Sequence, residues 1–310
     1  MKTYLELAQE VNGFPDKLHE PEAYAAFTKD YYAFRLAKFR CNFGLLPSHV
    51  ATAFKWPEFW SVDHNERTLT LNRGDNAEDR SAAFAETLNL MIQSSEVKAL
   101  KALRHENLPI FGPDGDVALN IDRAAIILFG GVVYGAQLLA YVRTELGIRY
   151  WVPTRSQTKK SYPNMLDVTV AGALDSGETP LEALVREAEE EAALPQDYVR
   201  ANLKPYGLLS FHLPTDANGK PGHGPQVQYV YTIELPADII PTPSDGEVDH
   251  FELMALEEVQ DALLGGKFKT NIAMTWIAYL ITLGKLNAEN EKNLYAITCH
   301  LHRKLEFPTR

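Results

Sequence analysis

GALDSGETPLEALVREAEEEAAL, residues 172–194, carries the strongest structural signal in this 310-residue chain. Thr179 can cap a helix that begins at Pro180, and Glu182 completes a Thr-x-x-Glu capping box. At about 100° per residue, the apolar side chains form one stripe, which consists of Leu181, Leu184, Val185, Ala188 and Ala192. The pattern predicts a helix over residues 179–193 with one face in a core.

Three carboxylates lie together on another face of this helix. Glu187, Glu190 and Glu191 are spaced i, i+3, i+4, roughly 120° from the apolar stripe. Like charges at this spacing destabilise a helix by a few tenths of a kcal/mol, and the carboxyl end of the helix dipole disfavours anions. Hard divalent cations accept such carboxylates as ligands. We therefore expect a metal-binding face, and the alternative is an ordinary solvated charge run.

The spacing of this stretch resembles the signature box of the Nudix hydrolases. Gly172 is followed after five residues by Glu178 and after seven more by Arg186, and the box then continues to Leu194. Seven of its eight fixed positions match, leaving aside the aliphatic position of Ala188. The departure is Ala193, where the pattern has the Gly that ends the helix in a left-handed turn.

The resemblance implies a loop-helix-loop unit that binds Mg²⁺, or Mn²⁺, and cleaves a diphosphate linked to another moiety. The metal ligands it implies are Glu187, Glu190, Glu191 and the backbone carbonyl of Gly172. Glu190 could also act as a base or orient water. Bound to the phosphates, the cation would offset their charge and activate a water molecule.

Other residues have supporting roles under the same resemblance. Arg186 would orient the carboxylates through bidentate pairing, and Glu178 would brace the loop. Glu247, in a later loop after the Pro-rich residues 241–243, is a further candidate for the base or for a metal ligand, with Glu252 in reserve.

A basic segment precedes the box. Residues 149–166 contain four Lys or Arg and no acid. We expect Arg155 and Lys159 to hold the diphosphate opposite the metals, and Trp151 and Met165 to contact a substrate ring or to belong to the core. Gln228 alternates with Gln226 on an expected strand, so it faces either a pocket or solvent.

Longer segments are similar to the thiamine pyrophosphokinase-related subgroup of Nudix proteins, which carries an extra N-terminal domain. They are WVPTRSQTKKSYPNMLDVTVAGAL, QVQYVYTIELP, SDGEVDHFELM and FKTN. The similarity implies hydrolysis of thiamine diphosphate, or of its oxo and oxy analogues, to the monophosphate. Alternatives are oxidised nucleoside diphosphates such as 8-oxo-dGDP, or a catalytically weak ligand-binding protein. A kinase is less favoured because no Gly-x4-Gly-Lys-Ser/Thr segment is present.

The pattern of elements predicts an α+β protein. We expect a smaller N-terminal α/β domain over residues 1–115, a Nudix α/β/α sandwich with a mixed sheet over 116–285, and a C-terminal helix packed on the core within 286–310. Helices are expected near residues 81–105, 271–283 and 289–302. Strand-like runs are expected at residues 124–129, 137–143, 150–153, 167–171 and 226–235.

Composition limits the classes of partner. Asp and Glu number 41 against 30 Lys and Arg, a formal charge of −11 that argues against a duplex-DNA binder. The apolar run at residues 272–282 is shorter than the roughly 20 residues that span a bilayer. The acidic start MKTYLELAQE does not resemble a targeting segment. We expect a cytoplasmic enzyme with a small-molecule diphosphate substrate and with no membrane or nucleic-acid partner, and a homodimer remains open.

Overall fold

The computed structural model of the protein describes residues 1–215 and 221–310. The helices are α1 (Tyr4–Val11), α2 (Pro21–Thr28), α3 (Ser48–Ala53), α4 (Ala77–Ser94), α5 (Arg123–Phe129), α6 (Pro180–Ala192), α7 (Gln196–Asn202), α8 (Leu256–Leu264), α9 (Ile272–Thr282) and α10 (Leu294–Leu301). The strands are β1 (Tyr31–Leu36), β2 (Asn42–Pro47), β3 (Trp60–Asp63), β4 (Thr68–Leu71), β5 (Asn107–Phe111), β6 (Val117–Asp122), β7 (Val133–Thr144), β8 (Gly147–Arg155), β9 (Val170–Ala173), β10 (Lys204–Thr215), β11 (Pro221–Glu234) and β12 (Val248–Met254).

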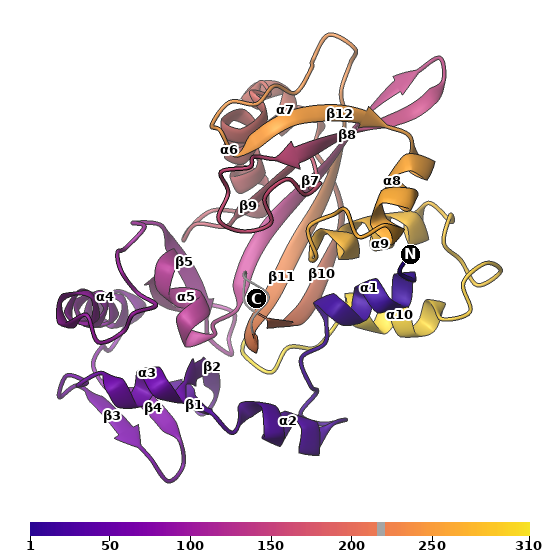
Figure 1. Ribbon diagram of the computed structural model, residues 1–310. Coiled ribbons are helices and arrows are strands. Elements are labelled where there is room, and N and C mark those ends of the chain that lie inside the picture. Colours follow the sequence, from indigo (N-terminus) through magenta and orange to yellow (C-terminus); the bar gives the residue numbers. More distant parts are fainter. Residues whose placement is uncertain (216–220) are drawn as a thin grey trace.

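The larger sheet is mixed and has β7 at its centre. Its order is β10-β11-β7-β8-β12, and β9 pairs with β7 off this path. β11 runs parallel to β7, whereas β8 and β9 run antiparallel to it. β7 changes partner along its length: residues 141–144 pair with β8 and residues 135–138 pair with β9. This change leaves the short strand β9, which carries Gly172, beside the centre of the sheet (Figure 1).

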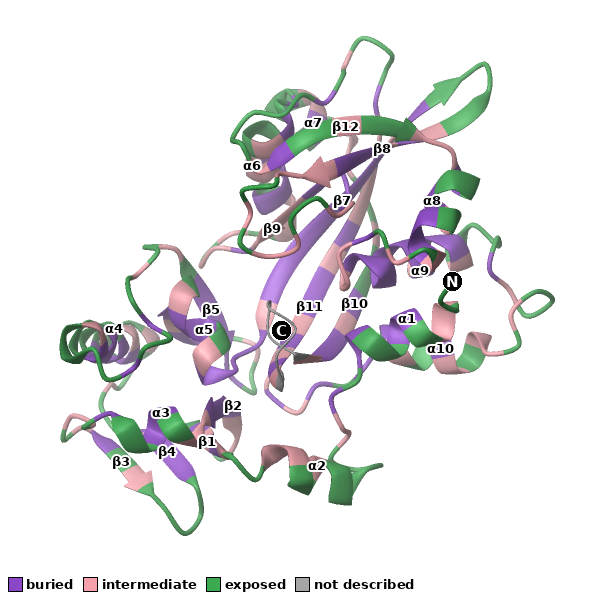
Figure 2. Cartoon of the chain, viewed as in Figure 1, coloured by how far each residue is buried: buried purple, intermediate pink, exposed green. Residues whose placement is uncertain are grey.

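Helices cover both faces of this sheet, as predicted for an α/β/α sandwich. Leu138 of β7 packs in a core with α6 and α7, and its neighbour Leu139 packs in a second core with α1, α8, α9 and α10. Alternate residues of a strand face opposite sides, so both faces of β7 are apolar. Figure 2 shows the buried residues concentrated on the inner strands. The predicted α+β class with a mixed sheet is confirmed.

The N-terminal region forms a separate packed unit, seen at the lower left of Figure 1. Its four-stranded sheet has the order β2-β1-β4-β3, and α3, α4, α5 and the β5–β6 hairpin pack in the same core. Residue 115, where we expected the domain boundary, lies inside that hairpin. Because residues 118–129 share the N-terminal core, we propose that the division follows Phe129.

Two local predictions were wrong. The run at residues 124–129, read as strand-like, is helix α5, because Asp122 caps it by accepting from Ala124 N at 2.8 Å and Gly130 ends it in a left-handed turn. Periodicity cannot distinguish a short apolar run in a strand from one in a helix. The helix expected over 81–105 is α4, which ends at Ser94, because Ser95 adopts a left-handed conformation with φ 58°.

The two ends of the chain pack together on one face of the larger sheet. α10 lies in the predicted C-terminal segment and shares a core with α1 and α9. Lys2 N also donates to Leu264 O at 2.8 Å. Among residues 1–215 and 221–310, no helix is both long and apolar enough to cross a membrane.

Candidate active site

Helix α6 begins and ends where the sequence predicts. Thr179 Oγ1 accepts from Glu182 N at 3.2 Å, and the Glu182 carboxylate accepts from Thr179 N at 2.9 Å, which completes the capping box. At the other end Ala193 adopts φ 50° and ψ 32°, and Leu194 N donates to Ala188 O at 3.0 Å. Ala193 therefore makes the left-handed turn that the Nudix box normally assigns to Gly, at a cost of about 1 kcal/mol.

Arg186 is the centre of the polar contacts around this helix. Its guanidinium donates to both oxygens of Glu178, at 2.8 and 3.0 Å, so the loop before α6 is tied to the helix by a bidentate pair. It also donates to Glu187 Oε1 at 2.9 Å and to Glu190 Oε2 at 3.2 Å. This pairing lowers the pKa of Glu178. The structure thus places Glu178 and Arg186 in contact, and the bracing and orienting roles of the two residues stay predictions.

Glu187 and Glu191 lie against β9. Glu191 accepts from Ala171 N at 3.1 Å, and a β-carbon on Gly172 would overlap the Glu187 carboxylate. Burial is the main reason why the pKa of Glu187 is raised to about 7 and that of Glu191 well above its usual range, and a neighbouring glutamate contributes to each rise. Buried carboxylates of this kind are normally paired or bound to a metal.

Glu190 lies on the exposed side of the same helix face, 52% exposed and held by Arg186. Among residues 1–215 and 221–310, no three His, Cys, Asp or Glu side chains are close enough to form a complete metal site. The structure therefore brings Glu187, Glu191 and the Gly172 backbone together and leaves Glu190 next to them. A set of carboxylate and carbonyl oxygens fits a hard divalent cation.

Glu247 lines a small crevice together with Glu191 of α6. The crevice is lined by Glu191, Glu247, Arg155 and Asp167 among others and has a volume of about 20 Å³, which is room for about one water molecule or ion. Asp167 was not among the predicted residues. It is 5% exposed, and its position inside the apolar run at residues 165–171 is the signal that could have identified it.

The two basic residues expected to hold the diphosphate each pair with an acid. Arg155 forms an ion pair with Asp167 at 2.8 Å and donates to the carbonyls of Ser161 and Tyr162 at 3.2 Å. Lys159 pairs with Glu247. Arg155 thus supports the loop at Ser161 and Tyr162 instead of presenting its charge directly.

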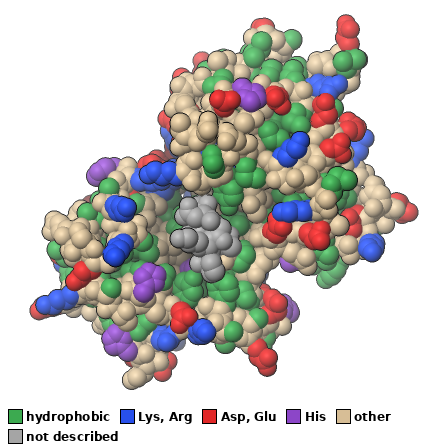
Figure 3. All heavy atoms as spheres, viewed as in Figure 1, with side chains coloured by type: hydrophobic (Ala, Val, Ile, Leu, Met, Phe, Trp, Pro, Cys, Tyr) green, Lys and Arg blue, Asp and Glu red, His purple; other side chains and the backbone are tan. Residues whose placement is uncertain are grey.

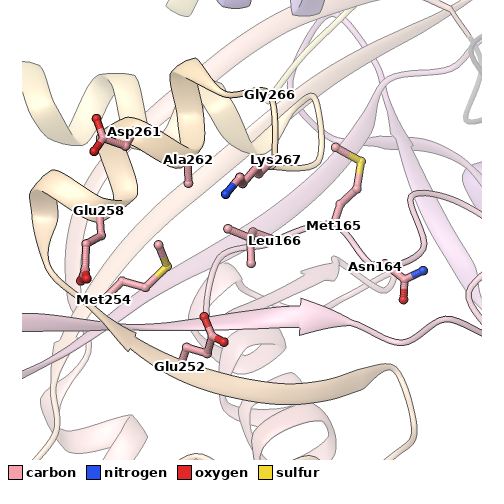
Figure 4. A pocket seen from close by; sticks show the side chains of 10 residues that line it. All are labelled: Asn164, Met165, Leu166, Glu252, Met254, Glu258, Asp261, Ala262, Gly266 and Lys267. Carbon is pink, nitrogen blue, oxygen red and sulfur yellow. The ribbon is translucent and has the colours of Figure 1, made fainter. Parts of the chain in front are cut away.

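The two apolar residues proposed for a substrate ring lie apart. Trp151 packs with the core beneath α6. Met165 lies at a different cavity of about 540 Å³, which is also lined by Glu252, Met254 and Lys267 (Figure 4). That cavity is formed by β12, α8 and the loop at residues 164–166, so Glu252 and Met165 are not part of the Gly172 site.

Gln228 lines a cavity of about 260 Å³ that reaches Ala171 and Gly172. It is 6% exposed, so the pocket-facing alternative for this residue holds and the solvent-facing one does not. The lining includes three residues that the sequence reading missed: Arg123, Gln137 and Lys269. Gln137 could have been suspected as an amide inside the apolar run of β7. On the face shown in Figure 3, Lys and Arg side chains are dispersed among acidic and apolar ones.

Comparison with known proteins places the chain in a family. Residues 140–274, which include β9 and α6, match the NUDIX domain family. The uncharacterized protein YJR142W of Saccharomyces cerevisiae is 31% identical over 261 residues, covering 81% of this chain and 76% of that protein. Nudix hydrolase 20, chloroplastic, of Arabidopsis thaliana is 29% identical over 214 residues. That match covers 69% of this chain but only 55% of the length of the relative.

A solved structure, that of DR0079 from Deinococcus radiodurans, is also similar. It has a TM-score of 0.39 and 28% identity, and the match covers 53% of this chain and 91% of DR0079. The matched NUDIX region contains Gly172, Glu178, Arg186 and the three glutamates of α6. The chain therefore belongs to the Nudix superfamily, with its NUDIX domain at residues 140–274.

Proposed function

We propose that this chain is a Mg²⁺-dependent diphosphohydrolase whose reaction centre is α6 and the Gly172 backbone. The observation that carries the proposal is the position of Glu187 and Glu191, two partly buried carboxylates set against β9 where the 260 Å³ cavity reaches Gly172. Burial raises the pKa of both, so the charged form of each carboxylate is not fully compensated by the protein. A divalent cation would supply that compensation.

Glu187, Glu191, Glu190 and the carbonyl of Gly172 would hold Mg²⁺ or Mn²⁺. When bound, the cation would offset the charge of the diphosphate and lower the pKa of a water molecule. Arg186 keeps Glu187 and Glu190 on one side of the helix through hydrogen bonds at 2.9 and 3.2 Å. Glu178 in turn fixes the guanidinium plane of Arg186.

Glu190 is our first choice for the base that takes a proton from the attacking water. It is the most exposed of the three glutamates on this face and reaches solvent, whereas Glu187 and Glu191 are partly buried. Glu247 is the second choice, because it lines the crevice with Glu191. Its ion pair with Lys159 must then open for it to act.

The substrate proposed is thiamine diphosphate or an oxo or oxy analogue, cleaved to the monophosphate and phosphate. This choice rests on the subgroup resemblance of residues 151–174 and 226–271. The cavity has a volume of about 260 Å³, which is small for a ligand pocket and is enough for one of the two rings of thiamine. An oxidised nucleoside diphosphate such as 8-oxo-dGDP is the alternative of similar size.

A phosphate-release assay tests the proposal. Thiamine diphosphate, oxothiamine diphosphate, oxythiamine diphosphate and 8-oxo-dGDP are each incubated with the full chain, with Mg²⁺ and with excess EDTA. We expect release from at least one thiamine compound, and only with the metal. Release only from 8-oxo-dGDP would mean that the substrate is an oxidised nucleoside diphosphate and not a thiamine diphosphate. No release from any compound would favour a ligand-binding protein.

A further inference from the structure

The cavity beside Gly172 has walls from both units of the chain. Four of its lining residues belong to β5 and α5 of the N-terminal unit: Leu108, Arg123, Ile126 and Ile127. Most of the other lining residues lie within the NUDIX domain at residues 140–274. A ligand that fills this cavity therefore contacts the N-terminal unit as well as the domain that carries α6.

The cavity also reaches the proposed reaction centre. Its lining includes Gly172, and the carboxylate of Glu187 lies directly against Gly172. A diphosphate bound at α6 therefore extends into the cavity, where negative phosphate oxygens need positive partners. Arg155 and Lys159, which were expected to fill this role, are each paired with an acid.

Two of the described lining residues carry positive charge, Lys269 and Arg123. Lys269 Nζ lies 3.6 Å from the carboxylate of Asp167, which is buried and also pairs with Arg155. Moving Lys269 away from a buried carboxylate costs more than breaking an exposed ion pair. The choice between the two cations therefore depends on how Arg123 is held.

Arg123 is held by an ion pair that a phosphate can replace. Its Nη1 donates to Glu106 Oε2 at 2.6 Å, and the two side chains are 42% and 38% exposed. An exposed pair of this kind contributes little to stability, so exchanging the carboxylate for a phosphate costs little. A guanidinium also carries five N–H donors in a fork that matches phosphate oxygens, and the contact with Glu106 uses one of them.

The backbone at Arg123 is fixed even though its side chain is exposed. The backbone N–H of Arg123 donates to Glu106 O at 2.8 Å. The carboxylate of the preceding residue, Asp122, is buried and accepts from His105 N and Ala124 N, each at 2.8 Å. The side chain of Arg123 therefore projects from a rigid junction between β6 and α5.

The loop that leads into α6 lies against the same part of the N-terminal unit. Ser176 N donates to Asn107 O, and Ser176 Oγ donates to Asn120 Oδ1, both at 2.7 Å. Asn107 begins β5 and pairs with Asp122, the residue before Arg123. These contacts fix the start of α6 relative to the junction from which Arg123 projects.

We propose that Arg123 binds the diphosphate of the substrate, so that the N-terminal unit supplies part of the active site. The inference rests on the proposed function, because it takes the diphosphate at α6 to be the ligand. The contact does not involve the ring of the substrate. It therefore applies equally to the thiamine compounds and to an oxidised nucleoside diphosphate.

Binding of a diphosphate analogue that cannot be hydrolysed tests this inference. The probe is methylenediphosphonate, in which a P–C–P bridge replaces the P–O–P linkage, titrated calorimetrically into the full chain with Mg²⁺ present. Arg123→Gln removes the proposed contact, whereas Glu106→Gln removes only the carboxylate that competes for it. Arg73→Gln is the control, because Arg73 forms an ion pair of similar exposure with Glu86 in the same unit. Circular dichroism checks the folding of each variant.

We expect Arg123→Gln to bind the probe at least about tenfold more weakly, the order of one charge-assisted contact. Glu106→Gln should bind it at least as tightly as the unmodified chain, because Arg123 is then released for the phosphate. Arg73→Gln should bind like the unmodified chain.

Four results would overturn the inference: unchanged binding in Arg123→Gln, an equal loss in Glu106→Gln, an equal loss in Arg73→Gln, or no binding by the unmodified chain. An equal loss in Glu106→Gln would assign Arg123 a structural role through its ion pair. Because the probe is not hydrolysed, a failed phosphate-release assay would refute the proposed function without changing this result.

Discussion

The close packing of this site depends on glycine, which has no side chain, at position 172. Its backbone lies so close to α6 that a β-carbon would overlap the carboxylate of Glu187. The resemblance to the Nudix box implied a role for Gly172 only through its backbone carbonyl, as a metal ligand. The structure adds a steric reason, which spacing along the chain could not reveal, because the contact depends on how β9 packs against α6.

Gly172→Ala should therefore lower turnover by displacing Glu187. Shifts of about 1 Å in a catalytic group can cost about 100-fold in rate, so we expect a loss of that order in phosphate release. Gly207→Ala is the matched control, since a β-carbon there meets nothing within 4 Å. Equal activity of the two variants would show that Glu187 is not confined by Gly172.

Ala193 is the position where the chain departs from the family pattern and keeps its geometry. With φ 50° and ψ 32° it holds the left-handed turn, which L-residues other than glycine adopt at a cost. Ala193→Gly should raise the free energy of unfolding by about 1 kcal/mol, measured by urea denaturation. A lower stability in this variant would mean that the alanine methyl group makes a favourable contact that outweighs the strain.

At the scale of elements, α6 and its preceding loop act as one unit through Arg186. The helix could be predicted from sequence because its signals are local: a capping box, a proline at the first position and an apolar stripe with helical spacing. The Arg186–Glu178 pair could also be predicted from the sequence, since the two residues are only eight positions apart. These contacts depend only on the helix and on the short loop that leads into it.

Arg186→Lys should loosen the loop without unfolding the helix. Lysine keeps the charge but cannot make the bidentate contact with Glu178. Because the pair is partly exposed, we expect a loss of at most about 1 kcal/mol in the free energy of unfolding. Turnover should fall by more than tenfold, since Glu187 and Glu190 lose their shared donor. Arg200→Lys, on the exposed surface of α7, should change neither the free energy of unfolding nor turnover. An equal loss of turnover in Arg200→Lys would show that the effect does not depend on the contacts of Arg186.

Other contacts could not be predicted because the residues that form them are distant in sequence. Arg155 was expected to face a phosphate, and it pairs with Asp167 through the packing of β8 against the segment before β9. The cavity beside Gly172 is lined by residues from Leu108 to Asn271. No local pattern identifies such a surface, which exists only after β7, β11, α5 and α9 have packed.

At the scale of the whole molecule, a buried histidine pair joins the two units. His223 of β11 donates through Nε2 to Leu45 O of β2 at 2.7 Å, and His212 Nε2 lies 3.3 Å from His223 Nδ1. The ring of Phe14 stacks on His212 at 3.7 Å between centroids. Both histidines are buried and neutral in this arrangement, because burial lowers the pKa of His223 to about 4 and that of His212 well below its usual range.

Acid should therefore weaken the folded protein in a defined window. The unfolded chain binds a proton at His223 near pH 6.5 and the folded chain only near pH 4, so unfolding takes up protons between these values and stability is lost as the pH falls. At pH 5 we expect His223 alone to account for a loss of about 2 kcal/mol. His223→Gln, which keeps a donor for Leu45, should make urea unfolding less dependent on pH between 6.5 and 4. His49→Gln, at an exposed site, should keep the full dependence, and equal slopes for the two variants would exclude this origin.

If one face of α6 performs the reaction, two adjacent glutamates of this helix should differ sharply in their effect on turnover. Glu190 lies on the face with Arg186 and Glu187, whereas Glu189 contacts Gln196 on α7. The measurement is Mg²⁺-dependent phosphate release from the best diphosphate substrate by Glu190→Gln and Glu189→Gln. We expect Glu190→Gln to lose at least about 100-fold in kcat with unchanged thermal unfolding, while Glu189→Gln keeps its activity. Retained turnover in Glu190→Gln, or equal losses in both variants, would contradict a reaction on this face.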